Sequence, residues 1–367
     1  MNSLLRRLSA EQDQSPWLDN LQRSYITNGT LRQLIDNGVR GLTSNPTIFQ
    51  KAIQGSADYD AQFIELIRNG VSPDDAYWEL VLSDIHGALD AFSPLYTESG
   101  GRDGFVSVEV DPSLARDSIG TLDAARNLHQ RINKPNVMIK IPATAEGLPA
   151  IRQMIAEGRN VNVTLIFSLD RYRDVMNAYI QGLEDRAAQG LAVSGISSVA
   201  SFFISRVDNE VDKLLDANGS PEALSLKGKA AINQARLAYQ MFTSMFSDDR
   251  WNELERAGAQ VQRPLWASTS TKNPTYPDTL YVDQLIGPRT VNTLPEPTLQ
   301  AFADHGRVAR TIDTSVEVAA EQWNVLGNYG VDVAEIARQL ENDGVASFIV
   351  SFNDLLDALR TKAREIA

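Results

Sequence analysis

Residues 137–144 read Val137-Met138-Ile139-Lys140-Ile141-Pro142-Ala143-Thr144, a β-rich apolar run with one lysine at its centre. An ammonium group among apolar side chains is costly, so burial of Lys140 would favour the uncharged amine. A free amine in a pocket is the group with which a Schiff-base enzyme attacks a ketone. The structural alternative is a lysine whose stem lies along a strand while its charged end reaches water. The run alone is compatible with both interpretations.

This run is one of eight short β-rich segments, each followed by polar residues and an amphipathic helical pattern. The expected strands are 15–19, 41–44, 105–110, 137–141, 161–167, 197–204, 264–268 and 290–294. The alternation is typical of βα units around a parallel sheet, and eight units favour a closed (β/α)8 TIM barrel. An open doubly wound sheet is the second possibility, weakened because no Gly-x-Gly-x-x-Gly motif follows an early strand.

Two helical regions exceed a minimal barrel. We predict a single domain over 1–367, with a helical insertion at about 56–98 and a helical tail from about 298. Ser72-Pro73-Asp74-Asp75 is a helix start signal in the insertion, because it combines an N-cap, an early proline and a capping acid. We expect both regions to cover the barrel, and a lid role for the tail stays open.

The composition excludes several kinds of site. The chain has no cysteine, which excludes disulfides, thiolate catalysis and zinc–thiolate or iron–sulfur centres. The three histidines, His86, His129 and His305, lie far apart and outside any ligand spacing. We therefore expect no histidine-based metal centre, whereas an all-carboxylate magnesium site stays open. A Schiff-base reaction at Lys140 would need no added metal or organic cofactor.

The net charge is −13, from 34 basic and 47 acidic residues. This charge argues against binding to nucleic acids or anionic membranes. The sequence shows neither a bilayer-spanning run nor a secretory signal, so we expect a cytoplasmic protein, monomeric or homodimeric. An anionic substrate would have to be held by a few local cations.

Polar residues stand at the ends of seven of the expected strands, where a barrel places its catalytic groups. They are Asp19, Thr43-Ser44-Asn45, Glu109, Lys140, Asn162 with Thr164, Ser201 with Arg206, and Ser270 with Lys272. One inward polar residue on an apolar strand is usually a core group with a hydrogen-bond partner. Seven strands that end in this way indicate a site.

Several of these residues lie in motifs that resemble those of the transaldolases. The runs Gly41-Leu42-Thr43-Ser44-Asn45-Pro46-Thr47-Ile48-Phe49 and 137–148 resemble the two signatures of that family, the second of which holds its Schiff-base lysine. Glu109-Val110-Asp111, 162–168 and 201–206 match further motifs in the family's order, from about residue 15 to about residue 295. The length of the chain suggests the longer-chain branch of the family.

The resemblance implies transfer of a dihydroxyacetone unit within the pentose phosphate pathway. The donors would be sedoheptulose 7-phosphate or fructose 6-phosphate, and the acceptors glyceraldehyde 3-phosphate or erythrose 4-phosphate. Lys140 would form the Schiff base with the C2 carbonyl, and Asp19 would take the C4 hydroxyl proton. Glu109 and Thr164, with a water between them, would move protons while the imine forms.

The resemblance also implies the residues that bind the substrate. Asn45, Asn162 and Ser201 would bind the hydroxyls of the three-carbon unit, and Phe203 would wall the pocket. Arg206, Ser270 and Lys272 would hold the phosphate. Shorter-chain members have Ser-x-Arg-Asn after the seventh strand, where this chain has Ser270-Thr271-Lys272-Asn273.

This departure matters because a lysine offers a phosphate a point charge instead of arginine's bidentate fork. Ser268 competes with Ser270 for the role of the phosphate-binding serine.

Two alternatives to a transaldolase stay open. The first is a Schiff-base aldolase that releases free dihydroxyacetone, such as a fructose 6-phosphate aldolase; the paired acids and two phosphate cations favour transfer. The second is a non-catalytic barrel that serves as a scaffold, which is disfavoured because every motif position is filled.

Overall fold

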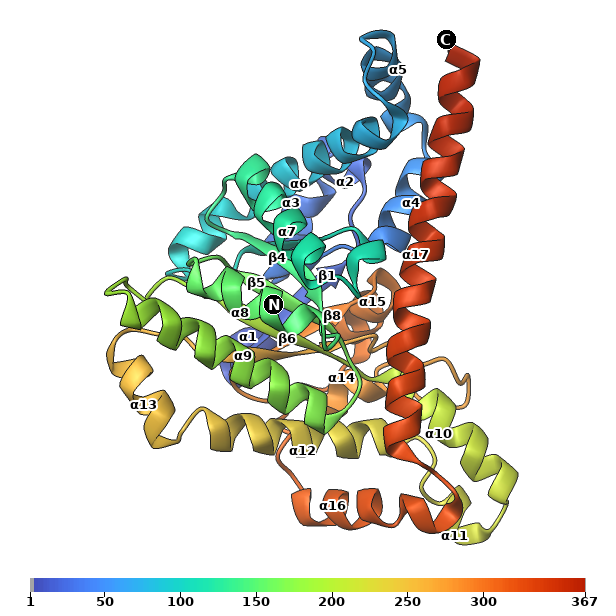
Figure 1. The fold of residues 1–367 in the computed structure, drawn as a ribbon. Helices are drawn as coiled ribbons and strands as arrows, with labels where there is room; N and C mark the ends of the chain where they lie inside the picture. Colours follow the sequence, from blue (N-terminus) through green and yellow to red (C-terminus); the bar gives the residue numbers. More distant parts are fainter. Residues whose placement is uncertain (1–2, 367) are drawn as a thin grey trace.

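The computed structural model describes residues 3–366, and its centre is a closed barrel of eight parallel strands in chain order (Figure 1). The strands are β1 (Gln14–Asp19), β2 (Gly41–Thr43), β3 (Phe105–Glu109), β4 (Val137–Pro142), β5 (Val161–Ile166), β6 (Ser198–Phe203), β7 (Gln262–Ala267) and β8 (Thr290–Leu294). The predicted TIM barrel is therefore confirmed, with strand boundaries within two residues of those expected. The doubly wound alternative is excluded, because β1 pairs with β8 and closes the sheet.

The register of the barrel aligns the polar strand ends. Lys140 on β4 pairs with Glu109 on β3 and with Asn162 on β5. Asp19 on β1 pairs with Thr43 on β2. Since the strands are parallel and in register, these residues meet at the carboxyl end of the barrel.

One irregularity lies in β5, directly after Thr164. The pairing of β5 with β6 shifts between Val163 and Ile166, and Leu165 has a φ of 63°. A positive φ is unusual for a branched residue and is typical of a bulge that changes the direction of a strand end. The Leu165 side chain packs here against Gly344 of the last helix, α17 (Val333–Ile366).

Helices surround the barrel. Those at the start and around the sheet are α1 (Leu4–Gln12), α2 (Arg23–Thr27), α3 (Thr30–Asp36), η2 (Pro112–Leu114), α7 (Ser118–Ile132), α8 (Gly147–Ala156), α9 (Leu169–Ala188), α10 (Ser205–Asn218), α11 (Pro221–Leu224), α12 (Ala230–Met245), α13 (Asp249–Arg256) and α14 (Leu280–Gln284). The segment after β2 forms α4 (Pro46–Gly55), η1 (Ala57–Tyr59), α5 (Asp60–Arg68) and α6 (Pro73–Glu98). The tail forms α15 (Glu296–His305), α16 (Val316–Asn324), η3 (Leu326–Tyr329) and α17 (Val333–Ile366). No helix in residues 3–366 is long and apolar enough to cross a membrane.

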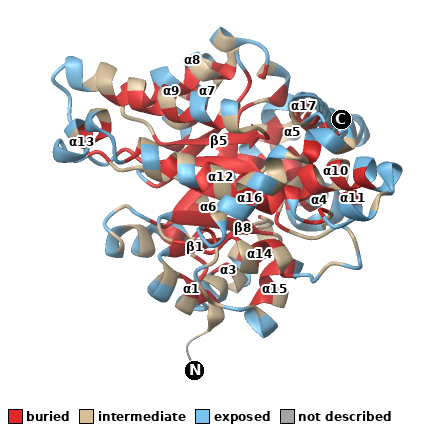
Figure 2. Ribbon diagram, turned by 90° about the horizontal axis from the view of Figure 1, so that it is seen from below, coloured by how far each residue is buried: buried red, intermediate tan, exposed pale blue. Residues whose placement is uncertain are grey.

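Figure 2 shows the strands buried at the centre of the molecule, with exposed residues on the outer helices. Trp17 and Trp266 are fully buried. Gly41 on β2 makes room for Trp17, because a Cβ at that position would lie 2.5 Å from its indole ring. Trp17 fills the barrel below the polar strand ends, whereas Trp266 packs against Phe202 on the outer face of the sheet. The barrel is therefore a packed core and not a channel.

The last helix, α17, runs beside α4 and α10 (Figure 1). Ser351 of α17 and Thr47 of α4 share a hydrogen bond of 2.8 Å between their hydroxyls. Gly344 lets the helix approach β5, because a Cβ there would lie 3.0 Å from Leu165 Cδ2. The middle of α17 therefore lies against the carboxyl end of the barrel.

A buried carboxylate, Asp208, joins α10 to α12 and α14. Its Oδ1 accepts a hydrogen bond from the Ala231 backbone N–H at 2.7 Å, and its Oδ2 accepts one from the Tyr281 hydroxyl at 2.8 Å. Loss of hydration raises the pKa of Asp208 to about 7, against the opposing effect of these two bonds. The protonated form of this group is therefore favoured by folding.

This buried acid predicts a pH dependence of stability. Between the unfolded pKa of about 3.9 and the folded pKa of about 7, the folded state binds more protons than the unfolded state. The contribution of Asp208 to the free energy of unfolding is complete below the unfolded pKa. It is lost as the pH rises toward the folded pKa, by up to about 1.4 kcal/mol per pH unit. Asp208→Asn should lack that decline when the free energy of unfolding is measured in urea from pH 5 to pH 8. Asp36→Asn, at an exposed position, is the control, and parallel curves for wild type and Asp208→Asn would contradict the assignment.

Candidate active site

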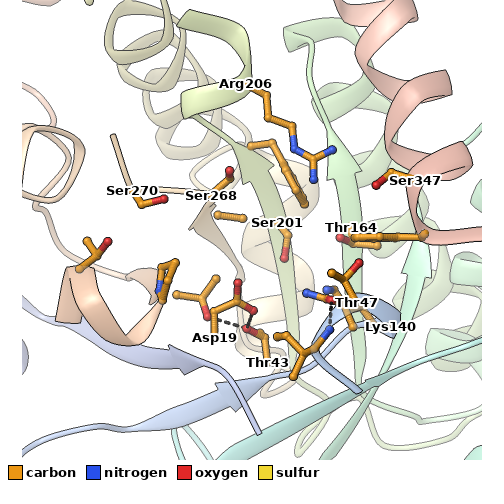
Figure 3. Close-up of a pocket in the computed structure, with 18 of the residues that line it drawn as sticks. Asp19, Thr43, Thr47, Lys140, Thr164, Ser201, Arg206, Ser268, Ser270 and Ser347 are labelled. Carbon is orange, nitrogen blue, oxygen red and sulfur yellow. Dashed lines mark hydrogen bonds between the residues drawn. The ribbon is translucent and has the colours of Figure 1, made fainter. Parts of the chain in front are cut away.

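A cavity of about 480 Å³ lies at the carboxyl end of the barrel (Figure 3). Nine of the eleven site residues predicted from the sequence line it: Asp19, Asn45, Lys140, Thr164, Ser201, Phe203, Arg206, Ser270 and Lys272. The other two, Glu109 and Asn162, are buried directly behind this surface and contact its residues. The structure thus brings the predicted residues together from seven strands.

Lys140 lies inside the barrel. It is only 4% exposed. The alternative interpretation, a strand lysine whose charged end reaches water at the outer surface, is therefore excluded. The Lys140 Nζ donates a hydrogen bond to the Ser44 carbonyl at 3.2 Å and lies 3.4 Å from Glu109 Oε2. The ring of Phe348, from α17, is centred 6.0 Å from the same nitrogen. The amine is therefore held in one place and borders the cavity.

Glu109 is a buried carboxylate next to this amine. Loss of hydration raises its pKa and the negative Asp19 adds to the rise, whereas the positive charge of Lys140 opposes it. Apart from the 3.4 Å ion pair with Lys140, neither carboxylate oxygen of Glu109 has a hydrogen-bond partner among the described residues, and the Thr164 hydroxyl has none either. Buried polar groups without protein partners are suited to bind a water or a reacting group.

Asp19 ends β1 on another wall of the cavity. Its Oδ1 accepts a hydrogen bond from Thr43 Oγ1 at 2.7 Å, and the Thr43 and Thr293 hydroxyls are 2.6 Å apart. Loss of hydration raises the pKa of Asp19, and Lys140, the Thr43 bond and Arg206 each lower it by less. A raised pKa makes the Asp19 carboxylate a stronger base toward a substrate hydroxyl.

A chain of hydrogen bonds crosses three strands behind the cavity. Ser201 donates to Asn162 Oδ1 at 2.7 Å, and Asn162 Nδ2 donates to the Ser107 hydroxyl at 3.0 Å.

Asn45 is the N-cap of α4, where its Oδ1 accepts a hydrogen bond from the Ile48 backbone N–H at 3.0 Å. This bond leaves the amide N–H groups of Asn45 for the cavity.

Besides Lys140, three basic side chains line the cavity: Arg206, Lys272 and Lys51. In Figure 3 the guanidinium of Arg206 points into the cavity from the side away from Lys140. Lys272 donates a hydrogen bond to Ser270 Oγ at 2.7 Å, and no described residue forms an ion pair with any of the three cations. Loss of hydration lowers the pKa of Lys272, and repulsion from Arg206 and Lys51 lowers it further. Unpaired like charges in a chain of charge −13 favour an anionic ligand.

Comparison with known proteins agrees with this geometry. The family model for Transaldolase/Fructose-6-phosphate aldolase matches residues 16–359. A transaldolase 1 of Streptomyces avermitilis is 49% identical over 98% of this chain and 96% of its own length. A transaldolase of Mycobacterium bovis is 48% identical and one of Parafrankia sp. is 51% identical, each over 94% of both chains.

The chain belongs to the transaldolase/fructose-6-phosphate aldolase family. The family resemblance seen in the two long signatures is therefore confirmed. In this member, the first signature supplies the Ser44 carbonyl that binds Lys140, and the second supplies Lys140 itself.

Several residues of the site were not predicted from the sequence. Lys51 could have been found, because Thr47, Ile48 and Lys51 share the face of α4 that borders the cavity. Ser347 and Phe348 of α17 also line it, but no local pattern connects the tail to strand ends that lie some 200 residues away. The Ser268 hydroxyl lies 3.0 Å from that of Ser205 and lines the cavity as Ser270 does, so both serines remain candidates for the phosphate.

The Thr43–Asp19 bond predicts a shift in the pH–rate profile. Thr43→Val removes the bond that lowers the pKa of Asp19, so that pKa should rise further. If the carboxylate of Asp19 takes the C4 hydroxyl proton while the C3–C4 bond of the donor breaks, the acid limb of the kcat/KM profile should move to higher pH. Thr293→Val, which leaves the Thr43–Asp19 bond in place, is the matched control. An unshifted limb in Thr43→Val, or equal shifts in both variants, would argue against Asp19 as the base.

Proposed function

We propose that this protein is a transaldolase that carries a dihydroxyacetone unit on Lys140. The observation that supports this most directly is a buried lysine amine 3.4 Å from a buried carboxylate, Glu109, in a cavity that also holds Asp19. The family match supports the same chemistry.

The first half of the reaction forms the imine. The Lys140 amine attacks the C2 carbonyl of the donor ketose and gives a carbinolamine. Glu109 then supplies a proton to the departing hydroxyl, directly or through a water bound at Thr164, and water leaves. The raised pKa of Glu109 supports this role, because the acid must hold a proton before it supplies that proton to the departing hydroxyl.

The second half breaks and remakes a carbon–carbon bond. Asp19 takes the proton of the C4 hydroxyl, the C3–C4 bond breaks, and its electron pair moves into the iminium to give an enamine. The aldose leaves, an acceptor aldehyde enters, and the reverse steps form the new bond while Asp19 returns its proton. The enamine must stay on the enzyme between these events, which separates transfer from simple cleavage.

Binding of the substrate is divided between the two sides of the cavity. Asn45, Asn162 and Ser201 would bind the hydroxyls of the three-carbon unit near Lys140, with Phe203 as a wall. Arg206, Lys272 and Ser270 would bind the phosphate of sedoheptulose 7-phosphate or fructose 6-phosphate. Lys51 adds a third cation. Its charge would compensate for the missing bidentate guanidinium, which an arginine at position 272 would have provided.

Several further features remain predictions. They are the single-domain organisation over 1–367, a cytoplasmic location, the monomeric or homodimeric state and a reaction without any cofactor.

Transfer is distinguished from release by the products. With fructose 6-phosphate and erythrose 4-phosphate, the enzyme should form sedoheptulose 7-phosphate and little free dihydroxyacetone. Lys140→Arg should show neither activity, because a guanidinium that is always charged cannot form the imine. Release of dihydroxyacetone at one rate with and without the acceptor would identify an aldolase instead.

The two acids should act at different steps. Asp19→Ala should still form an imine that borohydride traps, but it should transfer the unit at least about a hundredfold more slowly. Glu109→Gln and Thr164→Ala should slow trapping itself, measured as single-turnover labelling. Loss of trapping in Asp19→Ala with normal trapping in Glu109→Gln would reverse the assignment.

The cations should affect phosphorylated substrates alone. A charge-assisted hydrogen bond contributes roughly 1.5–3 kcal/mol, so Arg206→Gln or Lys272→Gln should lower kcat/KM for fructose 6-phosphate about ten- to a hundredfold. Lys51→Gln should lower it less, because Lys51 offers a single flexible point charge. Unphosphorylated fructose should be affected little, and Lys272→Arg should retain or improve binding. Equal losses on both sugars in Lys272→Gln would assign Lys272 to the fold.

A further inference from the structure

A second cavity, of about 550 Å³, lies at the opposite end of the barrel. Its lining residues come from the starts of the strands: Arg40 precedes β2, Asp103 precedes β3 and Arg289 precedes β8. Lys140, by contrast, lies near the end of β4. The cavity is therefore separate from the proposed active site, and the transaldolase reaction assigns no role to it.

The charge of this cavity differs from that of the whole chain. Its charged lining residues are the four arginines Arg40, Arg102, Arg263 and Arg289 and the three acids Asp13, Asp103 and Glu255. The local balance is thus 4 − 3 = +1, in a chain where acidic residues outnumber basic ones by 47 to 34. All four cations are arginines, whose planar fork matches the oxygens of a phosphate group.

A buried carboxylate fixes two of these arginines. Asp103 is 6% exposed, and its two oxygens accept hydrogen bonds from Arg40 Nε at 2.6 Å and from Ser15 Oγ at 2.7 Å. Arg263 NH1 lies 3.4 Å from Asp103 and donates to Ser15 Oγ at 3.0 Å. One carboxylate balances one of the two guanidiniums, so an uncompensated positive charge remains at the floor of the cavity.

The loop that carries Arg102 is held in place as well. Arg263 NH2 donates to the Arg102 carbonyl at 2.7 Å, and the Asp103 N–H donates to Ser99 Oγ at 3.0 Å. Gly104 has a φ of 83°, and a Cβ there would lie 2.5 Å from the Tyr96 nitrogen. Arg40 and Arg263 are therefore preorganised, which lowers the entropy lost on binding.

Donors on three of the guanidiniums remain unused. Arg40 bonds Asp103 through Nε, and Arg102 bonds the Ser99 carbonyl through Nε. The Arg289 guanidinium lies over the Phe242 ring at 5.2 Å and forms no hydrogen bond or ion pair with residues 3–366. The terminal N–H groups of Arg40, Arg102 and Arg289 have no acceptor in the described part of the chain.

We propose that this cavity is a second anion-binding site, which takes a small metabolite with a phosphate or diphosphate group. The excess charge and the free guanidinium donors bind the anion. The volume lies within the range of ordinary small-molecule pockets. The carboxylate of Glu255, which also lines the cavity, repels further negative charge on a ligand. We therefore expect a small anion instead of a large polyanion.

Pyrophosphate is a suitable probe, with binding measured by titration calorimetry on the full chain. An Arg206→Gln background weakens binding at the active site. In that background, adding Arg102→Gln and Arg289→Gln should weaken pyrophosphate binding by about tenfold or more. Both arginines are exposed and use no side-chain bond to Asp103, so the fold should persist, which a thermal unfolding scan checks.

The matched control adds Arg32→Gln and Arg68→Gln to the same Arg206→Gln background. Both arginines are exposed and lie outside the cavity, and their replacement changes the net charge by the same amount. This control should leave the affinity within about twofold. Pyrophosphate should also protect Arg102 and Arg289 from phenylglyoxal, as read by peptide mass. No binding in the Arg206→Gln background, equal weakening by both pairs, or protection confined to arginines outside the cavity would overturn the proposal.

Discussion

The site depends on one buried pair, the Lys140 amine and the Glu109 carboxylate 3.4 Å apart inside a closed barrel. Neither charge would be tolerable alone at this depth, because removing one partner leaves the other uncompensated. Together the two opposite charges compensate each other inside the protein. The Ser44 carbonyl fixes the direction of the amine, so that it borders the cavity and not the core.

The closed sheet makes this arrangement possible. Register pairs Lys140 with both Glu109 and Asn162, and the remaining strand ends complete the ring around the cavity. Large side chains such as Trp17 fill the barrel beneath, which excludes water from below. The middle of α17 lies against the open end through Phe348, so the tail belongs to the wall of the site.

The fold and most of the site could be predicted because both leave local signals. Alternating β-rich and amphipathic segments indicate the barrel, and polar residues such as Asp19 and Lys140 stand out at the ends of apolar strands. The bulge at Leu165 could not be predicted, because a leucine carries no turn signal for a positive φ. The contact of Phe348 with Lys140 could not be predicted either, since it joins segments 208 residues apart (348 − 140) without sharing a motif.

The central claim is that the reacting amine is that of Lys140. Borohydride reduction of the enzyme with fructose 6-phosphate, followed by digestion and peptide mass analysis, tests it directly. We expect one label, equal in mass to a reduced dihydroxyacetone unit, on Lys140 in the peptide that contains 137–144. A label on Lys51, Lys272 or any other lysine, with Lys140 unmodified, would contradict it.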